Sequence, residues 1–468
     1  MLFNSLEFLI LFLPVVLFVA FRIRGSMLTF WICLASTFFY AYAGHTWFLI
    51  PMFISATLDF WVGKKIDDSQ NKKHRKLYLW ISITANIGLL AYFKYSGLLL
   101  NTLHSVVTYT GFGKNMDDTW MSEWRVILPA GISFYTFQTI SYVIDIYRRD
   151  GKPEKSYFTY FSFVSFFPHL VAGPLTRHNQ LIPQIKKIAE RGIQPMWKAG
   201  IFLFIVGLSK KVLIADRIAN MIDPIIHNIS ITGALDAWLA LFGYAFQIYF
   251  DFSGYSDMAI GLGRLMQIEL PLNFNSPYKS VSPSDFWKRW HITLSQWLRD
   301  YLYISLGGNQ CSPNRQKLNL MITMTLGGIW HGASWNFLFW GVYHGVLLLA
   351  YHRFEHSWNR LNLYFRRGMM FVLVCMGWVF FRSPNLSTVQ SWFESLFFLH
   401  GFTGPVSMLS PQLIILVAFS LWISFSRKNT SEIDWERLPV WKCAVLGIVG
   451  GICIVLMNYS SSFLYFQF

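Results

Sequence analysis

The chain has 468 residues, of which 54% are apolar and only 13% are charged. Soluble domains carry about 25% charged residues, so this chain has about half the charge that a water-facing surface needs. The same composition excludes intrinsic disorder, coiled coil and collagen. The sequence therefore predicts an integral membrane protein.

The charge is unbalanced, with 39 Lys and Arg against 24 Asp and Glu, which gives a formal net charge of +15. The basic residues lie in short clusters between apolar segments, as in cytoplasmic loops under the positive-inside rule. No basic stripe with interleaved aromatic residues indicates a nucleic-acid partner. The 5 cysteines are odd in number, lie mostly in apolar segments and form no Cys-x-x-Cys, which argues against a disulfide framework and a structural zinc site.

The first third of the chain contains apolar segments that predict five spans. They are residues 6–21, 27–42, 47–62, 77–100 and 126–146. Basic clusters follow the first, third and fifth of them, and the acidic residues Asp117, Asp118 and Glu123 follow the fourth. This alternation predicts an N-terminus outside and basic loops in the cytoplasm. Because a signal peptide would have basic residues before its apolar part, we expect the first segment to remain as a spanning helix.

The apolar segment 158–174 is interrupted by Pro168, Gly173 and Pro174 and has basic residues on both flanks. Irregular backbone at membrane depth requires a protein-lined or wet cavity, so we predict a re-entrant segment. Further spans are expected at residues 198–214, 233–250, 319–337, 338–352, 368–382, 412–426 and 441–458. The predicted fold is one all-α polytopic membrane domain over residues 1–468, with about eleven to thirteen transmembrane helices plus re-entrant and interfacial helices around a central cavity.

The most informative stretch is residues 249–308. Asp251, Asp257, Arg264 and Glu269 would be costly in hydrocarbon, so this stretch is expected to face a polar cavity or the membrane interface. Asp251 and Asp257 are therefore candidates for substrate binding. The alternative is structural, with each aspartate paired to Arg264 or to another basic residue.

A helix start follows at residues 282–285, where a hydroxyl cap, a proline and an acid lie together. We predict a helix from there to about residue 303. One of its faces is aromatic and apolar, whereas a polar stripe holds Lys288, His291, Ser295 and Arg299. These four are candidate site residues, and Lys288 and Arg299 suit the phosphates of a donor. The alternative is an amphipathic support at the interface.

The second informative stretch is residues 324–345, where His331 lies among Gly327, Gly328, Gly332 and Ala333. Small residues let a substrate or another helix approach the imidazole closely. A histidine exchanges protons near neutral pH, which suits a general base acting on a hydroxyl. The alternative is a packing histidine between helices. The neighbouring candidates for substrate binding are Trp330, Ser334 and Asn336.

His344 lies further along the same stretch. In a continuous helix it would lie on a different face from His331 and about 20 Å away along the axis, so a structural role is expected. The sequence has no nucleophile elbow, P-loop, dinucleotide fingerprint or two-histidine zinc spacing. We therefore expect neither a metal nor a tightly bound cofactor.

A series of segments in this order resembles the membrane-bound O-acyltransferase family, in its bacterial branch typified by the alginate O-acetylation membrane protein. The segments are MLFNSLEFLILFLPVVLF (1–18), LPAGISFYTFQTISYVIDIYRRD (128–150), FFPHLVAGPLTR (166–177), the block 249–308 and WHGASWNF (330–337). The resemblance covers most of residues 1–350, and hydrophobicity alone supports the last third. It implies that His331, in the Trp-His-Gly element, is catalytic and that His291, in the Arg-Trp-His element, is a second catalytic candidate.

The resemblance further implies a multi-pass enzyme of the bacterial inner membrane, with acetyl-CoA as co-substrate and a periplasmic acetyltransferase as partner protein. The expected reaction is O-acetylation of an exported polysaccharide, first an alginate- or cellulose-like exopolysaccharide and second peptidoglycan. Two alternatives stay open, a lipid O-acyltransferase and, in another class, a transporter that flips an acylated carrier. The sequence shows no inverted repeat, which argues against the transporter.

Overall fold

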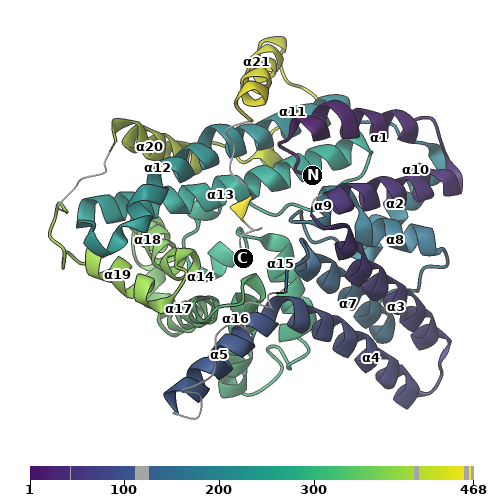
Figure 1. Ribbon diagram of the computed structural model, residues 1–468, viewed down its shortest axis with the longest axis horizontal. Helices are drawn as coiled ribbons and strands as arrows, with labels where there is room; N and C mark the ends of the chain where they lie inside the picture. The colour runs from purple at the N-terminus through teal and green to yellow at the C-terminus, as the bar shows by residue number, and fades with distance from the viewer. Residues whose placement is uncertain (43, 111–125, 405–409, 458–462, 465–468) are drawn as a thin grey trace. The chain divides into compact units, whose positions relative to one another are not determined.

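The computed structural model describes residues 1–42, 44–110, 126–404, 410–457 and 463–464, and every regular element among them is a helix (Figure 1). The predicted acidic loop with Asp117, Asp118 and Glu123 lies outside these residues. The chain forms two compact units, one of residues 1–2 and 10–194 and the other of residues 3–9 and 195–468. The all-α polytopic membrane fold is confirmed.

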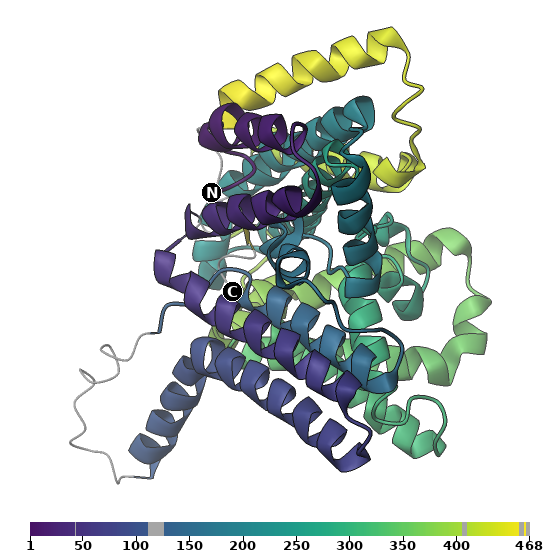
Figure 2. The same cartoon turned by 90° about the vertical axis from the view of Figure 1, so that its right-hand side faces the viewer.

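The first unit is a layer of packed helices. Its helices are α1 (Leu13–Ala20), α2 (Gly25–Tyr42), α3 (Leu49–Asp68), α4 (Lys72–Leu90), α5 (Ser96–Tyr109), α7 (Ile132–Arg148), α8 (Tyr157–Ser165), α9 (Phe167–Leu170) and α10 (His178–Arg191). Helix α3 packs against α4 and α7, and α2 packs against α8 and α10 (Figures 1 and 2). Each of the five apolar segments predicted in the first third of the sequence is at least partly helical, and those at 27–42, 47–62 and 77–100 lie in stretches that are long and apolar enough to cross a membrane.

Polar side chains join α3 and α4 where both helices are otherwise apolar. Ser82 and Asn86 of α4 donate hydrogen bonds of 2.6 and 2.8 Å to the carboxylate of Asp59 on α3. All three residues are buried. Hydrogen bonds between helices are an attractive force that remains available in lipid, where apolar contacts between helices gain little.

The predicted interruption of the apolar segment 158–174 is confirmed. Helix α8 ends at Ser165, and Phe166 has a non-helical ψ of 106° before the single turn of α9. A Cβ on Gly173 would lie 2.4 Å from the Cα of His169, so the chain can fold back here only without a side chain. The His169 Nδ1 atom lies 2.9 Å from the Thr176 hydroxyl, which closes the loop. The re-entrant position of this loop in a membrane stays a prediction.

The second unit is larger and contains all the candidate site residues. Its helices are α11 (Trp197–Ser209), α12 (Asp216–His227), α13 (Ala234–Leu265), α14 (Pro283–Trp287), α15 (Ile292–Trp297), α16 (Pro313–His331), α17 (Trp335–Asn359), α18 (Leu363–Arg382), α19 (Leu386–Leu396), α20 (Pro411–Ser426) and α21 (Val440–Leu456). Short π-helical segments join α11 to α12 (Lys210–Ala215) and follow α15 (Leu298–Tyr303).

Helix α13 is central in this unit and packs against α11, α12, α18, α19 and α20. Its contact with α11 depends on paired glycines, because a Cβ on Gly207 would lie 2.5 Å from the carbonyl oxygen of Gly254. This close approach of two backbones is typical of helix packing in membranes. The predicted span 233–250 is too short, because α13 continues to Leu265 and includes Asp251 and Asp257.

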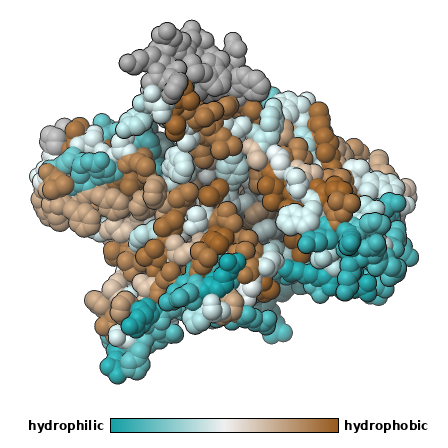
Figure 3. Space-filling view, turned by 90° about the horizontal axis from the view of Figure 1, so that it is seen from below, coloured by the Kyte–Doolittle hydropathy of each residue, from teal (hydrophilic) through white to brown (hydrophobic). Residues whose placement is uncertain are grey.

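Four stretches of described helix are long and apolar enough to cross a membrane, namely Gly25–Tyr42, Thr46–Asp68, Lys72–Tyr109 and Leu363–Arg382. Shorter apolar helices are Glu7–Ala20, Pro411–Ser426 and Val440–Leu456. Apolar side chains cover much of the surface seen in Figure 3, and α21 exposes Val440, Ile448 and Val455. Such exposure fits contact with lipid. The predicted total of eleven to thirteen spans stays a prediction.

Candidate active site

The predicted continuous helix from 284 to 303 is wrong. It begins as expected, since the Ser282 hydroxyl accepts a hydrogen bond of 3.1 Å from the Asp285 amide, but α14 ends at Trp287. Backbone bonds to the loop before α14 compete with the helix, because the Arg289 carbonyl accepts from the Asn275 amide. The chain bends, and His291 takes a left-handed conformation with φ 43° and ψ 55°. Strained backbone of this kind is concentrated at functional sites.

The bend opens a cavity of about 180 Å³ among α14–α17 and the π-helical segment Leu298–Tyr303. The residues that line it are Trp287, Leu294, Ser295, Leu298, Arg299, Tyr303, Leu320, Thr323, Met324, Gly327, His331, Trp340 and Leu348. The predicted site residues among them are Ser295, Arg299 and His331. The cavity is thus a mainly apolar pocket with a few polar groups, which is the usual composition of a small-molecule site.

His331 is the last residue of α16, and its side chain is surrounded by aromatic rings. The ring centroids of Trp330, Trp340 and Phe381 lie 5.0, 5.1 and 5.4 Å from that of the imidazole. The residue is 4% exposed, yet it faces the cavity. A buried imidazole at the wall of an apolar pocket is well placed to exchange a proton with a bound hydroxyl.

The glycines near His331 serve mainly to pack α16 against α17. A Cβ on Gly328 would lie 2.3 Å from the Phe337 carbonyl oxygen, and one on Gly332 would lie 2.0 Å from the Phe337 ring. The sequence predicted that these small residues admit either a substrate or another helix. At Gly328 and Gly332 they admit another helix. Gly327 differs, since it lines the cavity.

His291 lies next to His331, with ring centroids 6.2 Å apart. It is completely buried, and its Nδ1 atom lies 3.0 Å from the Asn273 side-chain oxygen. The bend that holds His291 lies outside the candidate spans, and burial lowers the pKa of this imidazole to about 3. The ring is therefore neutral at physiological pH. The structure thus brings the two predicted catalytic candidates together.

His344 does not share a continuous helix with His331, because α16 ends at His331 and Gly332 is extended before α17 begins. The separation that a continuous helix would give therefore does not apply here. The Trp340 ring contacts both imidazoles, at 5.1 Å from His331 and 4.8 Å from His344. His344 packs against Trp287 and is absent from the cavity lining, which fits the structural role expected for it.

The remaining candidates for substrate binding near the cavity have other surroundings. Trp330 contacts the rings of both His291 and His331. Asn336 donates a hydrogen bond of 2.7 Å to the Ser383 carbonyl, which ties α17 to the end of α18. Ser334 precedes the first residue of α17, and Lys288 is exposed in the bend. None of these four is among the residues that line the cavity.

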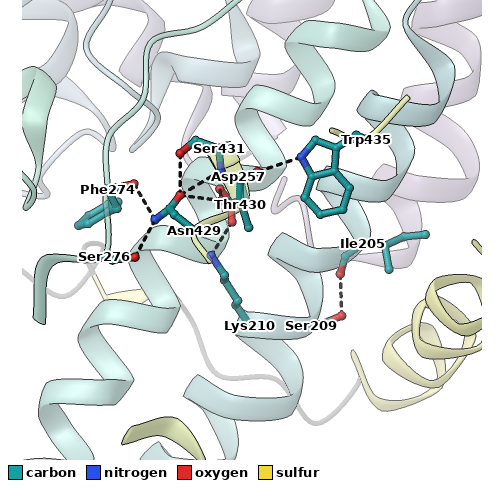
Figure 4. Close-up of polar contacts among 10 residues, drawn as sticks. All are labelled: Ile205, Ser209, Lys210, Asp257, Phe274, Ser276, Asn429, Thr430, Ser431 and Trp435. Carbon is teal, nitrogen blue, oxygen red and sulfur yellow. Dashed lines mark hydrogen bonds and ion pairs between the residues drawn. The ribbon is translucent and has the colours of Figure 1, made fainter. Parts of the chain in front are cut away.

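The two aspartates of α13 are buried in ion pairs, and their predicted pairing with Arg264 is not what the structure shows. Asp251 lies 2.6 Å from the Lys211 ammonium, which also contacts Asp216 at 2.9 Å. Asp257 lies 2.6 Å from Lys210 (Figure 4). The aspartates do not line the cavity. The alternative with another basic residue is therefore the observed one, and substrate binding by these aspartates is not supported.

Arg299 is the cationic residue of the cavity wall. Its side chain is 62% exposed, and its guanidinium donates a hydrogen bond of 2.6 Å to Asp300, which raises the pKa of the guanidinium above its ordinary value. Tyr303 and Thr323 add hydroxyl groups to the same wall. A buried imidazole and an exposed cation therefore border one apolar cavity, as a ligand with an anionic part and a reactive end requires.

The cavity lies in a part of the chain that matches a known protein family. The profile of the membrane-bound O-acyltransferase family matches residues 153–386, which contain every residue of the cavity. The peptidoglycan O-acetyltransferase of Helicobacter pylori is 32% identical over 100% of this chain and 98% of its own length. The chain belongs to the membrane-bound O-acyltransferase family.

Two other relatives are named for different acceptors. The probable alginate O-acetylase of Pseudomonas putida is 34% identical over the full length of both chains. The teichoic acid D-alanyltransferase of Bacillus subtilis is 31% identical over 49% of this chain and 60% of its own length.

Several residues that line the cavity or contact the histidine pair are not predicted by the sequence. Trp287 and Trp340 form much of the aromatic wall, and Asn273 contacts His291 from a loop that precedes α14. The tryptophans read as core residues because they occur at apolar positions. Nothing in the sequence distinguishes Asn273, because the same stretch also contains Asn275, Ser276 and Lys279.

Proposed function

We propose that this O-acyltransferase transfers an acetyl group from acetyl-CoA, taken from the cytoplasm, towards the O-acetylation of an exported polysaccharide. The observation that carries the proposal is His331, a buried imidazole at the wall of an apolar cavity whose rim holds Arg299. Relatives named as an alginate O-acetylase and a peptidoglycan O-acetyltransferase, both covered over nearly their whole length, support acetyl as the acyl group.

In the proposed reaction His331 accepts the proton of an acceptor hydroxyl. The hydroxyl oxygen then forms a bond to the acetyl carbon while the carbon–sulfur bond of the thioester breaks. The electron pair leaves on the sulfur of coenzyme A, which takes up the proton from the imidazolium. Arg299 suits the donor phosphates, because a guanidinium forms paired hydrogen bonds with phosphate oxygens.

The proposal places the enzyme in the bacterial inner membrane, with a periplasmic acetyltransferase as the partner that completes delivery to the polymer. An alginate- or cellulose-like exopolysaccharide is the first acceptor class. Peptidoglycan is the second, and it is favoured by the similarity to the peptidoglycan O-acetyltransferase of Helicobacter pylori. Sugar analysis of polymers from cells with and without the gene separates these two acceptors.

Purified protein in lipid nanodiscs tests the class of the protein. With acetyl-labelled acetyl-CoA, we expect release of free coenzyme A and movement of label to a small hydroxyl acceptor or to water. A transporter of an acylated carrier would leave the thioester intact, so unchanged acetyl-CoA with folded wild-type protein would contradict the proposal. A matched reaction with a long-chain acyl-CoA distinguishes a lipid O-acyltransferase, which would consume that donor equally well.

Replacement of Arg299 tests the proposed donor contact. We expect Arg299→Ala to raise the apparent Michaelis constant for acetyl-CoA by about 10-fold, because a hydrogen bond to a charged group contributes about 1.5–3 kcal/mol. The amount of folded protein should not change, since the guanidinium is largely exposed. The matched control is Arg437→Ala, which removes an arginine that also pairs with an aspartate but does not line the cavity. If the two variants have equal apparent Michaelis constants for acetyl-CoA, Arg299 does not bind the donor.

A further inference from the structure

We infer that Asn273 is a positioning residue which holds His291 in the tautomer with its proton on Nδ1, so that Nε2 is the unprotonated nitrogen of the ring. The loop between α13 and α14 supplies Asn273, and α15 begins directly after His291. The tautomer follows from the hydrogen bonds of Asn273, whereas its role in catalysis rests on the proposed function.

The first step is the orientation of the Asn273 amide. The side-chain oxygen lies 3.4 Å from the Thr293 backbone nitrogen and 2.9 Å from the Thr293 hydroxyl. A backbone N–H can only donate, so the amide atom that faces it must be the oxygen and not the NH₂ group. The NH₂ group then points the other way, where it donates a hydrogen bond of 3.3 Å to the Ser256 hydroxyl on α13.

The second step is the position of the proton on His291. The same Asn273 oxygen lies 3.0 Å from Nδ1 of the ring. An amide oxygen has no hydrogen to donate, so Nδ1 must carry the proton in this contact. Burial keeps the ring neutral, and a neutral imidazole has one protonated nitrogen and one acceptor nitrogen. Nε2 is therefore the acceptor.

The third step is the rigidity of this arrangement. The Asn273 carbonyl accepts a backbone hydrogen bond of 2.9 Å from Ile292, and the Asn275 amide donates one of the same length to Arg289. The loop and the bend are thus joined on both sides of His291. These bonds hold the residue in its left-handed conformation, which an isolated side-chain contact could not maintain against the strain.

Among the rings that contact His291, the titratable one is His331. Phe252 of α13 and Phe274 of the loop pack against the imidazole at 4.8 and 6.4 Å. Trp330 and His331 of α16 lie at 6.1 and 6.2 Å. An acceptor nitrogen on His291 can therefore serve the histidine pair as a proton acceptor, whereas the opposite tautomer would present a second donor.

Nitrogen NMR on the full chain tests the tautomer directly. The protein is labelled with ¹⁵N-histidine in lipid bilayers, and the His291 resonances are identified by their loss in His291→Gln. We expect a neutral ring protonated at Nδ1 in the wild type and in Asn273→Asp, which keeps an acceptor oxygen. In Asn273→Leu the preference should be lost. A wild-type ring protonated at Nε2 would overturn the assignment, even if the leucine variant does not fold.

Activity of the same variants tests the positioning role. We expect Asn273→Leu to lower the turnover of acetyl transfer about 10- to 100-fold per folded molecule, with little change in the donor constant, as is typical when an outer partner of an active histidine is lost. In Asn273→Asp turnover should be largely retained. Its fall in acid should begin at a higher pH than in the wild type, because a carboxylate beside Nδ1 favours the protonated imidazole.

The matched control is Asn86→Leu, which removes a buried asparagine of the first unit that donates to the Asp59 carboxylate. It should lower stability without moving the tautomer or the pH profile, and an equal loss of turnover would make Asn273 merely structural. A wild-type Nδ1 proton together with no release of coenzyme A from acetyl-CoA by the folded wild-type protein would refute the proposed function while the tautomer assignment stands.

Discussion

Replacement of His331 by glutamine should abolish acetyl transfer while the protein stays folded and abundant. Glutamine retains much of the volume and one polar contact of the histidine, but it cannot accept a proton. Loss of a general base lowers a rate by about 10²- to 10⁴-fold, which is the effect we expect on turnover. Polymer O-acetylation is measured in cells, and protein abundance is quantified in the same membranes.

The matched control is His344→Gln, since His344 is also buried and contacts the same Trp340 ring but does not line the cavity. This variant should lose stability, because glutamine cannot keep the ring contacts of the imidazole with Trp287 and Trp340, and an aromatic pair contributes about 0.5–1.5 kcal/mol beyond its buried area. Its turnover per folded molecule should stay within a few-fold of wild type. Substantial acetylation by His331→Gln at equal abundance would contradict base catalysis by His331 and favour His291.

Replacement of Lys211 should have the largest effect on stability. Its ammonium is 4% exposed and contacts both Asp251 and Asp216, so Lys211→Met leaves two buried carboxylates without this cation. Breaking a buried ion pair by removing one partner typically costs about 3–5 kcal/mol. We expect a marked fall in the melting temperature in detergent and in the yield of folded protein.

The control for Lys211 is Arg437→Met, because Arg437 pairs with Asp434 at an exposed site where the arginine is 89% exposed. Exposed pairs contribute about 0–1 kcal/mol, so this variant should melt close to wild type. A double variant Lys211→Met with Asp251→Asn should recover part of the lost stability. No recovery, or a Lys211→Met protein as stable as the control, would show that the pair does not hold α13 in place.

The sequence predicted most helices because their apolar segments are local features. Residues 27–42, 368–382 and 412–426 were expected as spans, and α2, α18 and α20 match them closely. The broken segment 158–174 was also recognisable, since prolines and glycines interrupt a helix wherever they occur. In these cases the determining interactions lie within the segment itself.

The failures occur where distant residues decide the backbone. Residues 284–303 have the cap and the periodicity of a helix, but backbone bonds with residues 273–275 bend the chain at His291. Helix α13 is longer than its apolar part because lysines from the segment after α11 pair with its aspartates. No local pattern contains either interaction. The two catalytic candidates came from the family resemblance, whereas their proximity could only come from the fold.

The residues that bind the α13 aspartates are far apart in the sequence, so they are synthesised at different times. Lys211 is synthesised before Asp251, so these two can pair as soon as α13 forms. The Asp251 carboxylate also accepts from the Leu464 amide, and Asp257 accepts from Thr430 (Figure 4). At about 5–20 residues per second, Leu464 emerges about 10 to 40 s after Asp251. During that interval the nascent chain holds an Asp251 carboxylate that lacks its bond from Leu464, so this unit completes its polar interior only after Leu464 has been made.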